Sequence, residues 1–311
     1  MKQYILPIAI LIWGAPLWAQ QLPHRSNLFT DASFIWNPAM TASWNFMEFG
    51  ANYRQQWLGF NEAPRTATAG IQFPFVAANM SVGGYLMHDE VGPLAYNSGA
   101  VSYSYKIRFN RGYGGQLAIG IMGSFGQYRF DGAQALATDP NDALLLDGRS
   151  TAVQPNFGAG LYYTSRSGDD YDENFVFAGL AANQLLASDL TFGQSGNPAN
   201  LRRALHANAL LGARFHSSAG FAEPALWVRY ATENVLHATL NFRYEMEEAF
   251  WAGLSYSTDQ SVGLQAGFIL TGGFFQDGQL RTGVQGTYNI GQLGGFQGAG
   301  MEGYIAYRFA L

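Results

Sequence analysis

A polar cluster with aromatic neighbours, Tyr53-Arg54-Gln55-Gln56-Trp57, is the most distinctive chemical feature of the sequence. Alternate side chains of a strand share a face, so Arg54 would lie on the same side as Glu48 and Asn52. A guanidinium and a carboxylate that face a protected interior can form a hydrogen-bonded ion pair. We therefore expect either a contact surface for a plug or a partner protein, or a polar network that fills a narrow interior.

Catalytic and metal-binding motifs are not found in the sequence. The five histidines are scattered, without a His-Glu-x-x-His motif or a serine nucleophile elbow. The chain has no cysteine, which excludes a lipoprotein anchor, a disulfide framework and a thiolate metal site. One segment offers oxygen ligands but lacks the spacing of a calcium-binding loop (Asp139, Asn141, Asp142 and Asp147). The sequence predicts no enzyme, no cofactor and no metal site.

The elements that position the polar residues are predicted to be β-strands. In residues 235–244, Leu236, Leu240 and Phe242 fall on one face and His237 and Arg243 on the other. This alternation recurs along the whole chain, in about fourteen segments separated by turn residues. The segments are 48–57, 66–75, 79–87, 96–109, 114–127, 155–166, 174–182, 205–216, 221–231, 235–245, 249–257, 262–271, 280–290 and 303–311.

Segments of about ten residues with this alternation are typical of a transmembrane β-barrel with an apolar outer face and a polar lumen. The longest gaps, 128–154 and 183–204, fall at one end of the predicted barrel, and the gap 88–95 falls at the same end. The fold class is therefore all-β, a single-chain antiparallel transmembrane barrel with short periplasmic turns and longer external loops. We expect its lumen to hold a polar network of Glu48, Asn52, Arg108, His237, Asn241, Arg243, Arg281, Gln285 and Arg308.

Composition and the first residues are consistent with a barrel of the outer membrane. Charged residues make up 13% of the chain, about half the roughly 25% usual for soluble domains. Residues 1–19 are predicted to be a signal peptide, because Lys2 precedes a mostly apolar stretch. Residues 20–47 would form a periplasmic or lumenal segment, and residues 48–311 the barrel. The net charge of −5 argues against nucleic acid as a partner.

Several short motifs follow one another along the chain and cover essentially all of it after the predicted signal peptide. They are Asn37-Pro38-Ala39, Tyr53-Arg54-Gln55-Gln56-Trp57-x-Gly59, Asp89-x-x-Gly92-Pro93, residues 155–163, Gly179-Leu180, Glu223-Pro224, residues 250–256 and Tyr307-Arg308-Phe309. In this order and spacing, the motifs resemble the PorP/SprF family of outer-membrane proteins. One departure from the family is the end of the chain, where Ala310 and Leu311 follow an aromatic residue.

The resemblance implies a component of the type IX secretion and gliding machinery in the outer membrane of a Gram-negative bacterium. Its partners would be outer-membrane lipids, a secreted adhesin or its C-terminal secretion domain, and periplasmic lipoproteins of the secretion ring. An alternative is a porin-like channel or a channel for hydrophobic solutes. For contact with a partner or a plug we expect Asn37, Pro38, Arg54, Gln55, Gln56 and Trp57.

Overall fold

The computed structural model of the chain describes most of the predicted strand segments. The described residues are 28, 30–44, 46–109, 114–132, 149–166, 174–192, 199–231, 235–246, 249–272, 275–291 and 298–310. The predicted signal peptide and the acidic residues 139–147 lie outside them. Within these residues, no helix is long and apolar enough to cross a membrane.

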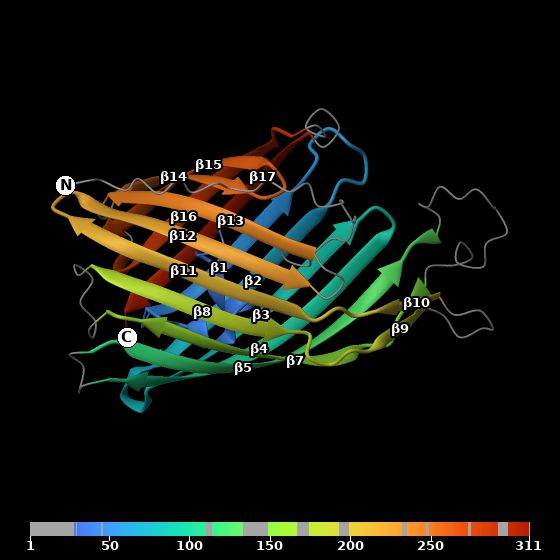
Figure 1. Cartoon of the computed structure of the whole chain (residues 1–311), viewed down its shortest axis with the longest axis horizontal. Coiled ribbons are helices and arrows are strands. Elements are labelled where there is room, and N and C mark those ends of the chain that lie inside the picture. The colour runs from blue at the N-terminus through green and yellow to red at the C-terminus, as the bar shows by residue number, and fades with distance from the viewer. Residues whose placement is uncertain are drawn as a thin grey trace, which may run out of the picture.

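The described chain forms a closed antiparallel barrel of fourteen strands, which confirms the predicted fold class (Figure 1). Each wall strand pairs with its neighbours along the chain, and all of these pairs are antiparallel. The wall strands are β1 Phe46–Gln55, β2 Arg65–Phe75, β3 Met80–Val91, β4 Leu94–Arg108, β5 Gln116–Phe130, β7 Gln154–Thr164, β8 Phe175–Asn183, β11 His206–Ser217, β12 Gly220–Ala231, β13 Val235–Met246, β14 Phe250–Ser257, β15 Ser261–Gly272, β16 Phe275–Asn289 and β17 Ala299–Ala310.

Pairing of the first strand with the last closes the barrel. In the register of β1 with β17, Glu48 lies opposite Arg308 and Asn52 opposite Tyr304. Closure leaves no strand edge with unpaired N–H and C=O groups, each of which would cost several kcal/mol in hydrocarbon. The barrel also explains why the alternating pattern continues to the end of the chain.

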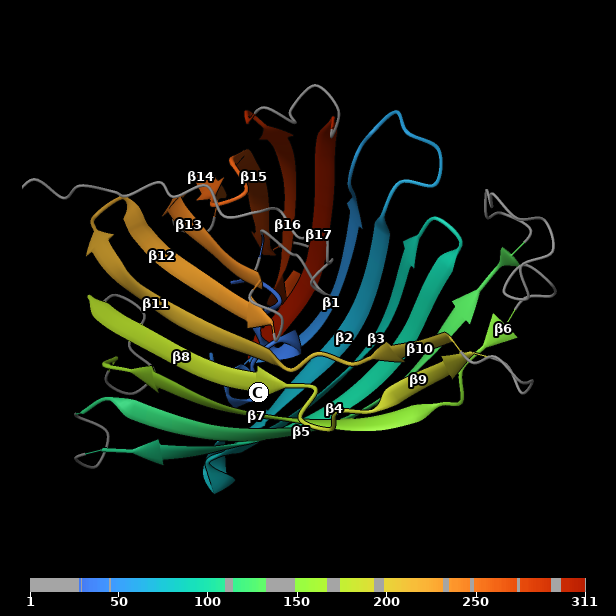
Figure 2. The same cartoon turned by 45° about the vertical axis from the view of Figure 1, so that its right-hand side comes forward.

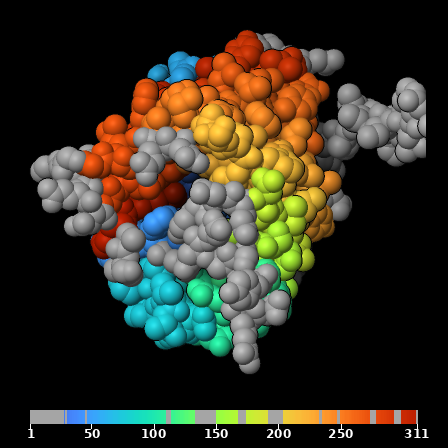
Figure 3. All heavy atoms as spheres, turned by 90° about the vertical axis from the view of Figure 1, so that its left-hand side faces the viewer, coloured from blue at the N-terminus to red at the C-terminus, as the bar shows by residue number. Residues whose placement is uncertain are grey.

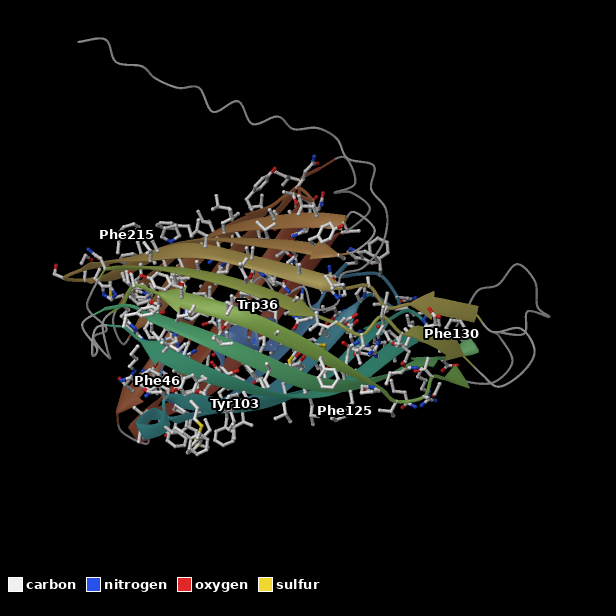
Figure 4. The ribbon with its side chains drawn as sticks, turned by 60° about the horizontal axis from the view of Figure 1, so that its bottom comes forward. Trp36, Phe46, Tyr103, Phe125, Phe130 and Phe215 are labelled. Carbon is white, nitrogen blue, oxygen red and sulfur yellow. The ribbon has the colours of Figure 1, made fainter. Side chains whose placement is uncertain are left out.

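The two faces of the wall differ as the alternation predicts. On β13, Leu236 is 65% exposed whereas His237 is 6% exposed, and on β4, Val101 is 66% exposed whereas Ser102 is 2% exposed. Side chains such as Tyr103 and Phe125 point away from the barrel, while Trp36 lies among the strands (Figure 4). The outer wall is therefore apolar and the interior is lined by polar side chains.

The connections differ between the two ends of the barrel, with one correction to the prediction. The gap expected at 88–95 is a tight turn, because β3 and β4 continue to Val91 and Leu94 and leave only Gly92 and Pro93 between them. Gly92 has a φ of 55°, which glycine adopts without a steric cost. The two longest gaps also contain short strands, namely β6 Arg149–Ser150, β9 Asp189–Phe192 and β10 Ala199–Arg202.

The residues before the first strand lie inside the barrel. Residues 28 and 30–44, which we call the plug, contain two short 3-10 turns, η1 Ser33–Ile35 and η2 Pro38–Met40. A further 3-10 turn, η3 Val76–Ala78, joins β2 to β3 outside the plug. The blue plug lies within the ring of strands in Figure 2. Figure 3 views the barrel from the end that carries the short turns, where blue atoms of the N-terminal part of the described chain lie between red and cyan strands.

Candidate functional site

The plug is attached to the wall by a buried group of charges. Arg243 Nη1 donates to both carboxylate oxygens of Asp31 in the plug, at 3.0 and 2.9 Å. Arg243 Nη2 donates to Glu245, which also accepts from Arg281 at 3.0 and 2.5 Å. The guanidinium carbon of Arg243 also lies over the ring of Trp251, 3.9 Å from its centroid. The two carboxylates balance the two guanidinium groups, so that no net charge is buried in this group.

A second group joins the C-terminal part of the plug to the strands where the barrel closes. The amide of Ala42 donates to Gln72 Oε1 at 2.7 Å, and Gln72 Nε2 donates to Glu48 at 3.0 Å. Glu48 also forms an ion pair with Arg308. A backbone group of the plug is thereby connected through three side chains to β2, β1 and β17.

Serine and lysine side chains of β4 support the same part of the plug. Ser104 Oγ donates to the carbonyl of Ala39 at 3.1 Å, and Lys106 Nζ donates to that of Ala42 at 2.6 Å. Thr41 shares a hydrogen bond of 2.8 Å with Ser102. The bonds from Ser104 and Lys106 give donors to two backbone carbonyl groups of the plug, as buried carbonyl groups require.

Asn37 organises the centre of the plug and fixes it against β7. Its Oδ1 accepts from the amide of Ala39 at 3.0 Å and caps η2, while its Nδ2 donates to the carbonyl of Leu161 at 3.1 Å. The plug approaches the wall so closely here that only glycine fits at the facing wall positions, Gly160 and Gly120. A Cβ at Gly160 would lie 2.1 Å from Asn37 Oδ1, and one at Gly120 would lie 2.2 Å from the amide nitrogen of Ala39.

Aromatic contacts fill the space beside these hydrogen bonds. Trp36 in the plug and Trp227 on β12 have ring centroids 5.1 Å apart, and both are 3% exposed or less. Asn183 Nδ2 donates to the carbonyl of Trp36 at 2.7 Å. At the end with the short turns, Trp44 lies between Arg166 and Arg214, whose guanidinium carbons are 4.2 and 4.4 Å from its ring centroid.

The remaining residues of the expected polar network make separate contacts within the wall. Arg229 Nη2 donates to His237 Nδ1 at 2.7 Å, and His237 Nε2 lies 3.4 Å from Asp259. Arg108 Nε is buried and has no hydrogen-bond partner among the residues that the structure describes. The other contacts are Asn52 to Glu302 at 2.7 Å, Gln285 to Ser255 at 3.1 Å, and Gln265 to Asn241.

The residues expected to contact a plug or a partner lie in two different places. Asn37 and Pro38 are fully buried and belong to the plug itself. Arg54, Gln55 and Gln56 are half-buried at the end of β1, whereas Trp57 is exposed in the connection to β2 and has a φ of 52°. Leu58 and Phe60 are exposed beside Trp57. This connection is the blue loop that extends beyond the wall in Figure 2.

Several residues that hold the plug were not among those selected from the sequence. Glu245 shares the inner face of β13 with Arg243, so the alternation contains the signal for it. Asp31 and Trp36 lie before the first strand, in a segment without periodicity, and no pattern there identifies their partners. Gln72 and Lys106 follow the same alternation on β2 and β4 but are isolated polar residues.

One hollow lies on the outer wall rather than in the lumen. It measures about 1120 Å³ and is lined by small residues, including Ala51, Ala69 and Gly303, and by large exposed ones such as Leu86 and Phe268. The exposed members of this lining face outward, so the hollow opens on the apolar surface. Inward-facing residues, among them Asn52, Thr68 and Met87, also border it.

A family model with the description "Type IX secretion system membrane protein PorP/SprF" matches residues 17–307. The chain belongs to the PorP/SprF family. This confirms the resemblance seen in the sequence and makes the chain a membrane protein of a secretion system. Members of this family and proteins with this fold serve secretion and transport. Among the described residues, no group of histidine, aspartate and glutamate side chains could hold a metal ion.

Solved structures with a similar fold are outer-membrane barrels. The CymD monoaromatic hydrocarbon channel is 12% identical, covers 90% of this chain and 92% of its own, and has a TM-score of 0.54. A Pseudomonas aeruginosa FadL homologue is 9% identical, with coverage of 88% and 92% and a TM-score of 0.50. At these identities the likeness concerns the fold alone. None of the curated proteins matches this PorP/SprF chain.

Proposed function

We propose that this PorP/SprF protein is a non-enzymatic component of the type IX secretion and gliding machinery in the outer membrane of a Gram-negative bacterium. In this role it assists the secretion or surface attachment of adhesin-type cargo proteins. Contact with periplasmic lipoproteins of the secretion ring would link it to the rest of the machinery. Family membership supports the secretion system as the setting, and the barrel fold supports the outer membrane as the location.

The observation that carries the proposal is the plug. Asn37 and Ala39 are fully buried in the lumen, and the plug is held by an ion pair, by several hydrogen bonds and by the Trp36–Trp227 contact. A lumen filled and cross-linked in this way favours a rigid scaffold over an open pore. The residues that remain available to partners are then those of the loops and the outer wall.

The connection between β1 and β2 is the cargo contact that we favour. Trp57, Leu58 and Phe60 expose apolar side chains there, and the loop is held by the Leu58 amide, which donates to the carbonyl of Ala299 at 2.7 Å. Exposed aromatic residues on a fixed loop are typical of protein interfaces. Arg54 and Gln56 lie directly beneath and would orient this loop.

A tagged pull-down from detergent-solubilised outer membranes tests this proposal, with mass spectrometry of the recovered proteins. We expect a large secreted adhesin, or ring lipoproteins, with the native protein. The double variant Trp57→Ala and Phe60→Ala should lose the adhesin while its amount in the membrane is unchanged. Phe75→Ala removes an equally exposed aromatic residue at the other end of β2 and should behave like the native protein. Unchanged recovery with the double variant would contradict the loop assignment.

Conductance of the purified barrel in a planar bilayer distinguishes the alternative channel function. A plugged scaffold should remain closed in the presence of small hydrophobic solutes. If no secretion protein is recovered and the native barrel shows solute-dependent conductance, the channel function replaces the secretion role.

A further inference from the structure

A second, smaller hollow lies inside the barrel, directly beside the plug. It measures about 90 Å³, several times the roughly 10–15 Å³ that one water molecule requires. Ile35 and Trp36 of the plug form one side of it. Strands β3, β4, β5, β7, β8, β11 and β12 contribute most of the rest, and Gln184 and Arg203 come from the connection between β8 and β11. Its lining combines aromatic rings with a few polar groups, among them Tyr96, Asn183, Arg203 and Arg229.

Arg203 is the unusual member of this lining. It follows β10, and its backbone amide donates to the carbonyl of Ser188 at 3.1 Å, which fixes the segment that carries it. Its side chain is 6% exposed, and within the described part of the chain Nε and Nη2 have no hydrogen-bond partner. The guanidinium carbon lies 6.0 Å from the ring centroid of Tyr96. A buried guanidinium with unused donors is costly unless something else satisfies it.

No carboxylate among the described residues around the hollow balances the positive charge of Arg203. None of the described residues that line the hollow is an aspartate or a glutamate. Arg229 donates to His237 Nδ1, so His237 carries its proton on Nε2, which faces Asp259 at 3.4 Å. Asp259 therefore balances Arg229 through the imidazole. Arg203 forms no such ion pair with the described residues.

A second unsatisfied group is an acceptor. Asn183 Nδ2 donates to the carbonyl of Trp36, but Asn183 Oδ1 is buried and has no donor among the residues that the structure describes. Arg203 and Asn183 both line the hollow, so its wall has unused guanidinium donors and one unused acceptor on an apolar and aromatic background. A group that fits it would carry one negative charge and one hydrogen-bond donor.

We propose that this hollow is a binding site for a single carboxylate with an adjacent hydroxyl or amide donor. The planar fork of Arg203 binds the carboxylate with two parallel hydrogen bonds, a geometry that lysine does not reproduce. The donor of the ligand reaches Asn183 Oδ1. One monoanion neutralises the charge of Arg203, whereas phosphate carries more than one negative charge on average at neutral pH and so brings more than the site can balance. The site is independent of the proposed role in secretion.

Glycolate is a suitable probe, because it carries a carboxylate and a hydroxyl on two carbon atoms. Tryptophan fluorescence of the purified full-length barrel reports binding, since Trp36 and Trp227 line the hollow. Glycolate should produce a saturable change at constant ionic strength, maintained with chloride. Arg203→Gln should weaken binding at least tenfold, and Arg203→Lys should weaken it less. Arg65→Gln, at an exposed arginine on β2, should leave it unchanged.

Thermal unfolding of the same proteins gives an independent measurement. Without glycolate, Arg203→Gln should be at least as stable as the native protein, because it removes an uncompensated buried charge; this result also shows that the variant folds. With glycolate, the native protein and Arg65→Gln should gain stability equally, Arg203→Lys should gain less, and Arg203→Gln should gain least. The proposal is overturned by an unsaturable response of the native protein, by equal affinity of Arg203→Gln, or by tighter binding of phosphate than of glycolate.

Discussion

Removal of the Asp31 carboxylate tests how the plug is held in the lumen. Asp31 is 6% exposed and is the plug's ion-pair partner of Arg243, at 2.9 Å. In Asp31→Ala the guanidinium of Arg243 remains buried and keeps Glu245 at 3.0 Å. The wall group then holds two arginines against one carboxylate, so the variant leaves an uncompensated positive charge beneath the plug.

The expected cost follows from the partners that remain. Breaking a buried ion pair by removing one partner costs about 3–5 kcal/mol. Because Glu245 and the face of Trp251 still stabilise Arg243, we expect a value near the lower limit, about 3 kcal/mol. Every 1.4 kcal/mol is a factor of ten in an equilibrium constant, so the undocked plug should become on the order of 100-fold more populated.

A single thiol in the plug can measure this population. The native chain has no cysteine, so Ser43→Cys, at a position that is 9% exposed, provides the only reactive group. Its rate of modification by a soluble maleimide reports opening when reclosing is fast. We expect the rate to rise on the order of 100-fold with Asp31→Ala, in proportion to the population of the undocked plug. Asp31→Asn should give a smaller rise, since it keeps an oxygen that accepts from Arg243.

The matched control is Glu62→Ala, which removes an exposed carboxylate in the connection between β1 and β2. It should leave the modification rate of Ser43→Cys unchanged. An equal rate in Asp31→Ala and in the native background, with the barrel still folded, would refute the assignment of Asp31 as a main attachment point. Equal acceleration by Glu62→Ala would show instead that the thiol responds to general loosening of the barrel.

Three further substitutions test the fit of the plug to the wall, each by thermal unfolding in detergent and by the same thiol assay. Gly120→Ala should destabilise the docked plug by about 1–3 kcal/mol, because its Cβ would lie 2.2 Å from the plug backbone. The control is Gly123→Ala on the same strand, whose Cβ would meet nothing within 4 Å and should have no such effect. Trp36→Ala should cost about 3–5 kcal/mol through the cavity left beside Trp227, and a cost below 1 kcal/mol would contradict its role. Asn37→Ala should cost about 1–3 kcal/mol, since it removes the cap of η2 and the hydrogen bond from Asn37 Nδ2 to the carbonyl of Leu161; an unchanged modification rate would show that this contact is dispensable.

The strands and their two faces were predictable from the sequence because a strand places alternate residues on opposite sides. That period identified the inward positions of His237, Asn241 and Arg243 without any knowledge of the fold. The boundary between β3 and β4 was wrong, since Val91 and Leu94 continue the hairpin through a glycine–proline turn. The short strands in the two longest gaps were also missed, because polar loop sequences carry no alternation.

The sequence by itself determined the barrel, the number of its strands and the family, because alternation and motif order are local properties of the chain. Only the tertiary structure decided what fills the lumen. Asp31 and Arg243 are 212 positions apart, and the segment that contains Asp31 has no period that could assign it a place. Its position depends on shape, through Gly120 and Gly160, which leave room for its backbone. Among the described residues no carboxylate pairs with Arg203, and this too results from how the wall and plug surround it, which no local pattern encodes.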